Sequence, residues 1–143
     1  MMSVLLSIEE GRDASSAIAQ VIALAREETV RVHLLNVRTP LPSYVARFIP
    51  ALERRAFHHE NGMRAMQEAI ARLDEAGIAH REEVRVDNEK AETILQAARE
   101  KRCAEIIVAG HEGLLAGLGL GSIRAQLRHL LQPGESLRIR EAA

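Results

Sequence analysis

Apolar runs and amphipathic stretches alternate along this chain. Short runs rich in Val, Ile and Leu, bounded by polar residues or glycine, are typical of strands buried in a sheet. Between these runs, apolar residues recur at steps of three and four, which is the spacing of a helix with one buried face. The pattern predicts strands at 4–8, 30–37, 79–86, 105–109 and 136–140, and helices from Asp13 onward and over 52–73, 90–100 and 122–131.

This order of elements predicts a single α/β domain over residues 1–143. Strands that alternate with helices form right-handed crossovers, which build a parallel sheet covered by helices on both faces. We therefore expect a five-stranded parallel or mostly parallel sheet. The more polar strand at 79–86 is expected at a sheet edge, and prolines at 40, 42 and 50 make 38–50 a loop or a region of broken turns.

Composition narrows the class of protein. Hydrophobic residues make up 47% of the chain but aromatic residues only 2%, so the core is expected to be aliphatic. The net charge of −1 argues against nucleic-acid or membrane binding through bulk charge. A single cysteine, Cys103, excludes a disulfide framework and is expected to be a structural thiol. The N-terminus has no basic region before its apolar run, so we expect no signal peptide and a cytoplasmic protein.

A glycine-rich segment between the strand at 105–109 and the helix at 122–131 is the strongest sign of chemistry. Glycines let backbone amides approach a ligand closely, and the N-terminus of the following helix favours an anion. The segment is not a Walker A motif, because no lysine precedes Ser122. It is not a dinucleotide fingerprint either, since that motif follows the first strand of its fold.

The segment from Ala104 to Gly113, followed by Gly121 and Ser122, resembles the motif of the universal stress protein family, as does the order of elements along nearly the whole chain. The resemblance implies a fold of the adenine nucleotide alpha hydrolase type and binding of ATP. In that case Gly110, Gly113, Gly121 and Ser122 would hold the phosphates and ribose, and Glu9 would help to position the adenosine.

The chain departs from the family motif at two places. Glu9 stands where the family usually has Asp, and only seven residues separate Gly113 from Gly121 instead of nine. No Lys or Arg lies between Gly110 and Ser122, and Glu112 adds a negative charge, so binding of ATP would depend on Arg124, His111 or a divalent cation such as Mg²⁺. The alternative is a glycine loop kept only for a tight turn between strand and helix.

Other candidates have simpler structural explanations. His58, His59 and Glu60 lack the spacing of a metal site, and His59 falls on the apolar stripe of its helix, so we expect it to be packed or at an interface. His33 is expected inside its strand. No catalytic residue is evident, so we expect at most a slow ATPase.

The resemblance also implies a homodimer through the last strand, of which only Leu137 and Ile139 are apolar. Two functions remain open. The first is a stress-associated protein that binds an adenine nucleotide at the loops after the first and fourth strands. The second is a dimeric interaction or regulatory module, with an unidentified protein partner, that does not bind a nucleotide.

Overall fold

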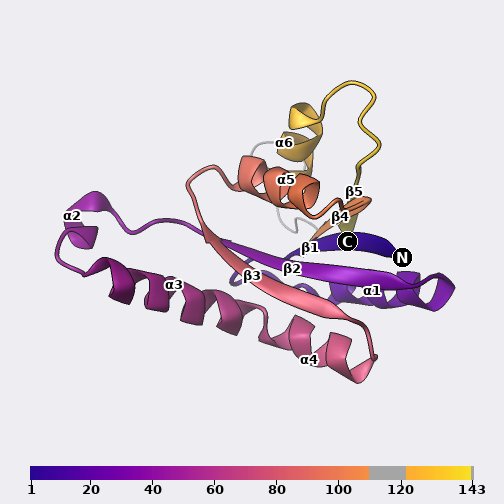
Figure 1. Ribbon diagram of the computed structural model, residues 1–143, viewed down its shortest axis with the longest axis horizontal. Helices are drawn as coiled ribbons and strands as arrows, with labels where there is room; N and C mark the ends of the chain where they lie inside the picture. Colours follow the sequence, from indigo (N-terminus) through magenta and orange to yellow (C-terminus); the bar gives the residue numbers. More distant parts are fainter. Residues whose placement is uncertain (110–121, 143) are drawn as a thin grey trace.

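A five-stranded parallel sheet forms the centre of the computed structural model, which describes residues 1–109 and 122–142 (Figure 1). The strand order is β3-β2-β1-β4-β5. The elements are β1 (Met2–Ser7), α1 (Ser15–Glu27), β2 (Val30–Arg38), α2 (Ser43–Ala46), α3 (Ala51–Ala65), α4 (Gln67–Glu75), β3 (His80–Val86), α5 (Lys90–Glu100), β4 (Glu105–Ala109), α6 (Ile123–Leu130) and β5 (Arg138–Ala142).

The expected α/β fold is confirmed, and every strand pair is parallel. The strand at the centre of the sheet is β1, and its Ser7 pairs with Leu35 of β2 on one side and with Val108 of β4 on the other. The strand β3 lies at one edge, as its polar sequence predicts, and β5 lies at the other.

Helices cover the two faces of the sheet and enclose two aliphatic cores. In β2, Val32 and Leu34 face the first core, under α1, α3 and α4, whereas Leu35 and Val37 face the second, under α5 and α6. Successive side chains of a strand point to opposite faces, so a strand buried on both faces needs apolar residues at consecutive positions, as at Leu34 and Leu35. The low aromatic content is consistent with cores built from Leu, Ile, Val, Ala and Met.

The long helix expected over 52–73 consists of two helices, α3 and α4, which meet at Met66. Its buried face also differs from the predicted one. His58 and Gly62 are buried in α3, whereas His59 is exposed and Leu52 is 75% exposed. The reason is Gly62, which brings α3 against Val84 of β3: a Cβ at position 62 would lie 2.5 Å from Val84 Cγ2. The expectation of a packed His59 is therefore wrong for this chain on its own.

The connection from β2 to α3 projects past the end of the sheet and carries α2 (Figure 1). It also carries two exposed rings: Tyr44 is 66% and Phe48 is 76% exposed. The third ring, Phe57, lies in α3 and is 46% exposed, so all the Tyr and Phe side chains of the chain fall within residues 44–57. The Arg54 guanidinium holds the connection in shape by donating to the backbone oxygens of Ala46 (2.8 Å) and Ile49.

The last strand is displaced by two residues from its predicted position, because Ala142 is buried against the first core. Leu137 and Ile139 are each 8% exposed and belong to the second core. They are therefore used within the chain, and the homodimer expected through this strand stays a prediction. No helix among the described residues is both long enough and apolar enough to cross a bilayer.

Candidate functional site

The carboxyl ends of β1 and β4 lie side by side at the centre of the sheet. The chain runs from β1 through α1 to β2, and from β4 through α6 to β5. Because α1 lies on one face of the sheet and α6 on the other, the strand order reverses between β1 and β4. In open parallel sheets, ligands bind at this kind of switch point.

Glu9, which follows β1, lies at this switch point in contact with two cations. Its carboxylate is 3.3 Å from Lys90 Nζ and 3.3 Å from Arg12 Nε, and the Glu9 side chain is only 19% exposed. Lys90 is the first residue of α5, so the ion pair joins the start of that helix to the end of β1. Neither cation was singled out by the sequence analysis. The contact with Lys90 spans 81 residues and leaves no local pattern, whereas Arg12 lies only three residues after Glu9.

Further contacts fix the loop that carries Glu9. The buried amide of Asn36 in β2 donates to the Ile8 carbonyl oxygen at 2.8 Å, and the Ile8 N–H donates to the Leu35 carbonyl oxygen at 2.9 Å. One residue beyond Glu9, the Glu10 carboxylate accepts from Arg38 at 2.6 Å. The loop is therefore tied to β2 and α5 before any ligand is present, which lowers the entropy lost on binding.

Ser122 caps α6. Its Oγ accepts a hydrogen bond from the Ala125 backbone N–H at 3.3 Å, which satisfies one free amide of the first turn. The described residues do not include Gly110, Gly113 and Gly121. The shortened segment between Gly113 and Gly121, and the charge of Glu112, also lie outside them. No hydrogen bond or ion pair joins Glu9 to Ser122 in the part of the chain that is described.

Arg124, which the sequence analysis considered as a cation for the phosphates, has its guanidinium 3.8 Å from Glu141 of β5 and lines a hollow beside that strand. Its role toward a nucleotide stays a prediction. His111, the other proposed cation, lies outside the described residues. In the described part of the site, the positive charges beside Glu9 belong to Arg12 and Lys90.

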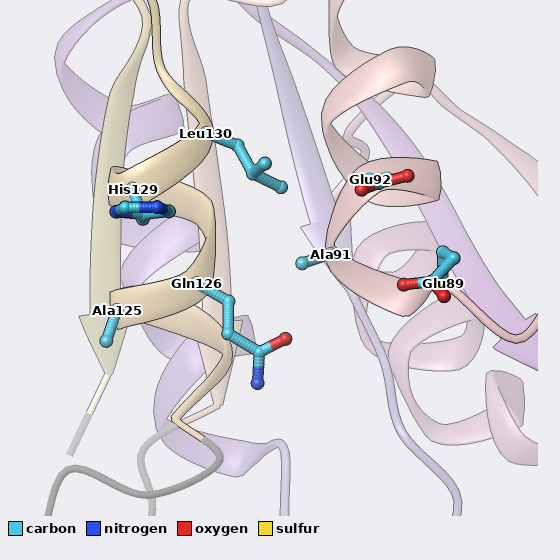
Figure 2. Close-up of a pocket in the computed structure, with 7 residues that line it drawn as sticks. All are labelled: Glu89, Ala91, Glu92, Ala125, Gln126, His129 and Leu130. Carbon is cyan, nitrogen blue, oxygen red and sulfur yellow. The ribbon is translucent and has the colours of Figure 1, made fainter.

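A cavity of about 350 Å³ lies between α5 and α6 (Figure 2). Gln126 and Leu130 point from α6 toward α5, and Ala91 points back from the first turn of α5. The cavity therefore adjoins the residue that pairs with Glu9, since Lys90 precedes Ala91 directly. Its volume is within the range of small-molecule sites. Its wall combines apolar groups with the amide of Gln126, the imidazole of His129 and the carboxylates of Glu89 and Glu92.

The other candidate residues show no reactive arrangement. Cys103 is buried, and burial raises the pKa of its thiol to about 11, which is the opposite of an activated nucleophile. Burial lowers the pKa of His58, as do Arg38 and Arg54, and burial together with Lys101 lowers that of His33. The described residues contain no group of three His, Cys, Asp or Glu side chains placed to hold a metal ion.

A parallel sheet of order β3-β2-β1-β4-β5, covered by helices on both faces, defines a doubly wound α/β fold. The model of the universal stress protein family matches residues 1–131. The chain belongs to the universal stress protein family.

Solved structures of the family share the fold at low identity. A universal stress protein family member from Burkholderia pseudomallei has a TM-score of 0.68 and 23% identity, over 97% of this chain and 93% of its own. A universal stress protein from Archaeoglobus fulgidus in complex with dAMP has a TM-score of 0.67 and 14% identity, over 100% of this chain and 98% of its own. A universal stress protein in complex with cAMP has a TM-score of 0.70 and 17% identity, over 99% of this chain and 98% of its own. Among the curated protein sequences compared, none matches this chain.

Proposed function

We propose that this protein binds an adenine nucleotide, ATP in the first instance, at the carboxyl ends of β1 and β4. The observation that carries the proposal is the cluster of Glu9, Arg12 and Lys90 at the switch point of the sheet. Members of the same family have been solved with dAMP and with cAMP. Glu9 is proposed to accept hydrogen bonds from the nucleoside, and Gly110, Gly113, Gly121 and Ser122 to hold the phosphates and ribose.

The charges of the cluster suit an anionic ligand. A carboxylate has about four lone-pair positions, so Glu9 keeps acceptor capacity after pairing with Arg12 and Lys90. The two cations outnumber the one carboxylate, and they supply positive charge that the glycine segment itself lacks. With no activated nucleophile or metal group among the described residues, we expect binding without rapid hydrolysis.

Calorimetric titration of the purified protein with ATP, with and without Mg²⁺, tests the proposal. We expect heat of binding in the wild type and none in Gly121→Asp, because a carboxylate at that position would repel the phosphates. Lys90→Met is expected to weaken binding about tenfold, since the loss of one charge near a phosphate at about 8 Å costs on the order of 2 kcal/mol or less.

Lys101→Met is the matched control, because Lys101 follows the opposite end of α5 and is the only other lysine of the chain. It is expected to bind ATP as the wild type does. Absence of heat in the wild type at high micromolar protein would rule out nucleotide binding. Equal heats in the wild type and Gly121→Asp would place the ligand elsewhere.

The second candidate function is an interaction module that binds no nucleotide. The exposed rings of Tyr44, Phe48 and Phe57 favour it, because a chain with an aliphatic core gains nothing for its own folding from exposing them. The same titration with ATP separates the two functions. If the purified protein carries no nucleotide and binds none, the interaction module is the better explanation.

A further inference from the structure

On the side of the sheet that carries α5, the apolar core ends at β2, and no residue of β3 belongs to it. The parallel register places Leu5 of β1, His33 of β2 and Arg81 of β3 in one row across the sheet, with their side chains on this same face. Leu5 is buried in the second core, whereas Arg81 is exposed. His33 therefore lies where the apolar core ends and a charged surface begins.

A hollow of about 240 Å³ opens at this boundary. Leu5 and Leu35, each only 1% exposed, give it an apolar wall. It is also lined by His33, Arg81 and Lys101, the last of which directly follows α5. Water screens charges less effectively beside an apolar wall, so these side chains attract an anion more strongly than they would on an open surface.

The cations around the hollow lack carboxylate partners. Arg81 and Lys101 form no ion pair and no side-chain hydrogen bond with the described residues. The same is true of Arg31, which lies two residues before His33 on the same face of β2. Like charges that are held together without a counterion repel one another. This part of the fold thus gathers positive charge without neutralising it.

The carboxylates near the hollow are already paired. Glu83, on the same face of β3, accepts from Arg85 Nε at 2.9 Å, and the same guanidinium donates to Glu100 of α5 at 2.6 Å. Glu82 belongs to the opposite face of β3, where it contacts His80. The cations of the hollow therefore remain available to an external anion.

The His33 imidazole responds to this surplus of positive charge. Burial lowers its pKa most, and Lys101, Arg31 and Arg81 lower it further, whereas Glu83 raises it. The ring is therefore neutral at pH 7, and it makes no hydrogen bond within the described part of the chain. A bound anion would reverse the effect of the cations, because an opposite charge nearby stabilises the protonated ring.

We propose that this hollow binds a small oxyanion of charge −2, such as a phosphate group. Arg81 and Lys101 supply the positive charge, and the His33 imidazole donates a hydrogen bond to the anion. The hollow is smaller than the roughly 300–1,000 Å³ of sites for larger organic ligands, so it fits a phosphate group with a small substituent rather than a nucleotide. It shares no residue with the proposed nucleotide site, so each proposal can fail without the other.

Titration with sulfate, followed by nuclear magnetic resonance of the histidine rings, tests the proposal. Sulfate keeps its charge of −2 over the pH range in which histidine titrates. The chain has six histidines, and His33→Gln identifies the signal of His33. We expect sulfate to raise the pKa of His33 by about 1, and chloride at the same ionic strength to raise it far less. Equal effects of the two salts, or no effect of sulfate, would overturn the proposal.

The pH dependence of the affinity gives an independent result. Because the anion raises the pKa of His33, binding takes up a proton, and the affinity for sulfate should increase up to about tenfold as the pH falls through the pKa of His33. In His33→Gln this increase should be absent. An affinity that changes with pH in the same way in both proteins would overturn the role of His33.

The two lysines of the chain separate this site from the nucleotide site, since Lys90 begins α5 and Lys101 follows its other end. Lys101→Met and Arg81→Gln are each expected to weaken sulfate binding about tenfold. Lys90→Met is the matched control and should bind sulfate as the wild type does, although it weakens binding of ATP. If Lys90→Met and Lys101→Met weaken sulfate binding equally, the anion binds elsewhere and the proposal fails.

Glycerol 3-phosphate distinguishes the two sources of such an anion. Tighter binding of glycerol 3-phosphate than of sulfate would identify a phosphate monoester as the ligand, and the reverse order would identify a free oxyanion. Both results support the proposal if Lys101→Met weakens the binding. Binding of glycerol 3-phosphate that persists unchanged in Lys101→Met would count against this site.

Discussion

Replacing Gly62 by alanine is expected to destabilise the protein through its contact with one residue of β3. The added Cβ would lie 2.5 Å from Cγ2, 2.6 Å from Cγ1 and 3.1 Å from Cβ of Val84. Rotation of the valine cannot clear all three atoms, so α3 must move away from the sheet. Overpacking of this kind costs about 1–3 kcal/mol.

The higher helix propensity of alanine acts in the opposite direction. Alanine is a better helix former than glycine by about 1 kcal/mol within a helix, so the net destabilisation is expected to be at most about 2 kcal/mol. For a chain of this size, that corresponds to a melting temperature lower by at most roughly 8 °C. Thermal unfolding followed by far-ultraviolet circular dichroism measures it.

Combining Gly62→Ala with Val84→Ala isolates the contact. The second substitution removes both methyl carbons that the new Cβ would meet, so the double variant should be more stable than the sum of the two single effects by about 1–3 kcal/mol. Ala71→Gly, at an exposed position of α4, measures the cost of glycine in a helix without such a contact. Additive effects in the cycle, or a Gly62→Ala protein more stable than the wild type, would refute the reasoning.

Three further predictions concern ionisable groups. Burial lowers the pKa of His80, but its contacts with Asp74 and Glu82 outweigh burial and raise it above 6.5. This contribution to stability should therefore be full below pH 6.5 and be lost as the pH rises above that value, so the urea midpoints of His80→Gln and wild type should converge there. The hydrogen bond from Arg99 lowers the pKa of Glu135 to about 2, so its contribution should be lost as pH falls from about 4.5 toward 2, and Glu135→Gln should flatten that part of the stability profile. Because the Cys103 thiol has a pKa of about 11, iodoacetamide at about pH 8 should modify it far more slowly in the native protein than in urea.

The sequence predicted the strands and the sheet well, because a strand buried on both faces must be apolar along its length. The strand 105–109 and the helix 90–100 have the predicted bounds. The long helix was less predictable. A pattern of apolar residues placed His59 inward, but Gly62, which has no side chain to contribute to such a pattern, determines which face of α3 packs on the sheet.

The candidate site was predictable only in part, because contacts between elements that are distant in the sequence leave no local pattern. Glu9 could be placed because it follows a recognisable strand, whereas its contacts with Lys90 and Arg12 depend on how α5 and the loop settle in three dimensions. Arg124 is a similar case. Its position near the start of α6 predicts a role at the glycine segment, but its contact with Glu141 of β5 could not be read from the sequence.

The projecting segment between β2 and α3 also determines what optical spectroscopy can detect in this protein. Its single tyrosine, Tyr44, is 66% exposed in the native state, and no tryptophan is present. Ultraviolet fluorescence should therefore change little when the aliphatic cores melt. Tyrosine emission instead reports on this segment alone. A molecule that covers the segment changes the surroundings of Tyr44, and the sheet contains no other Tyr or Trp that would add to the signal.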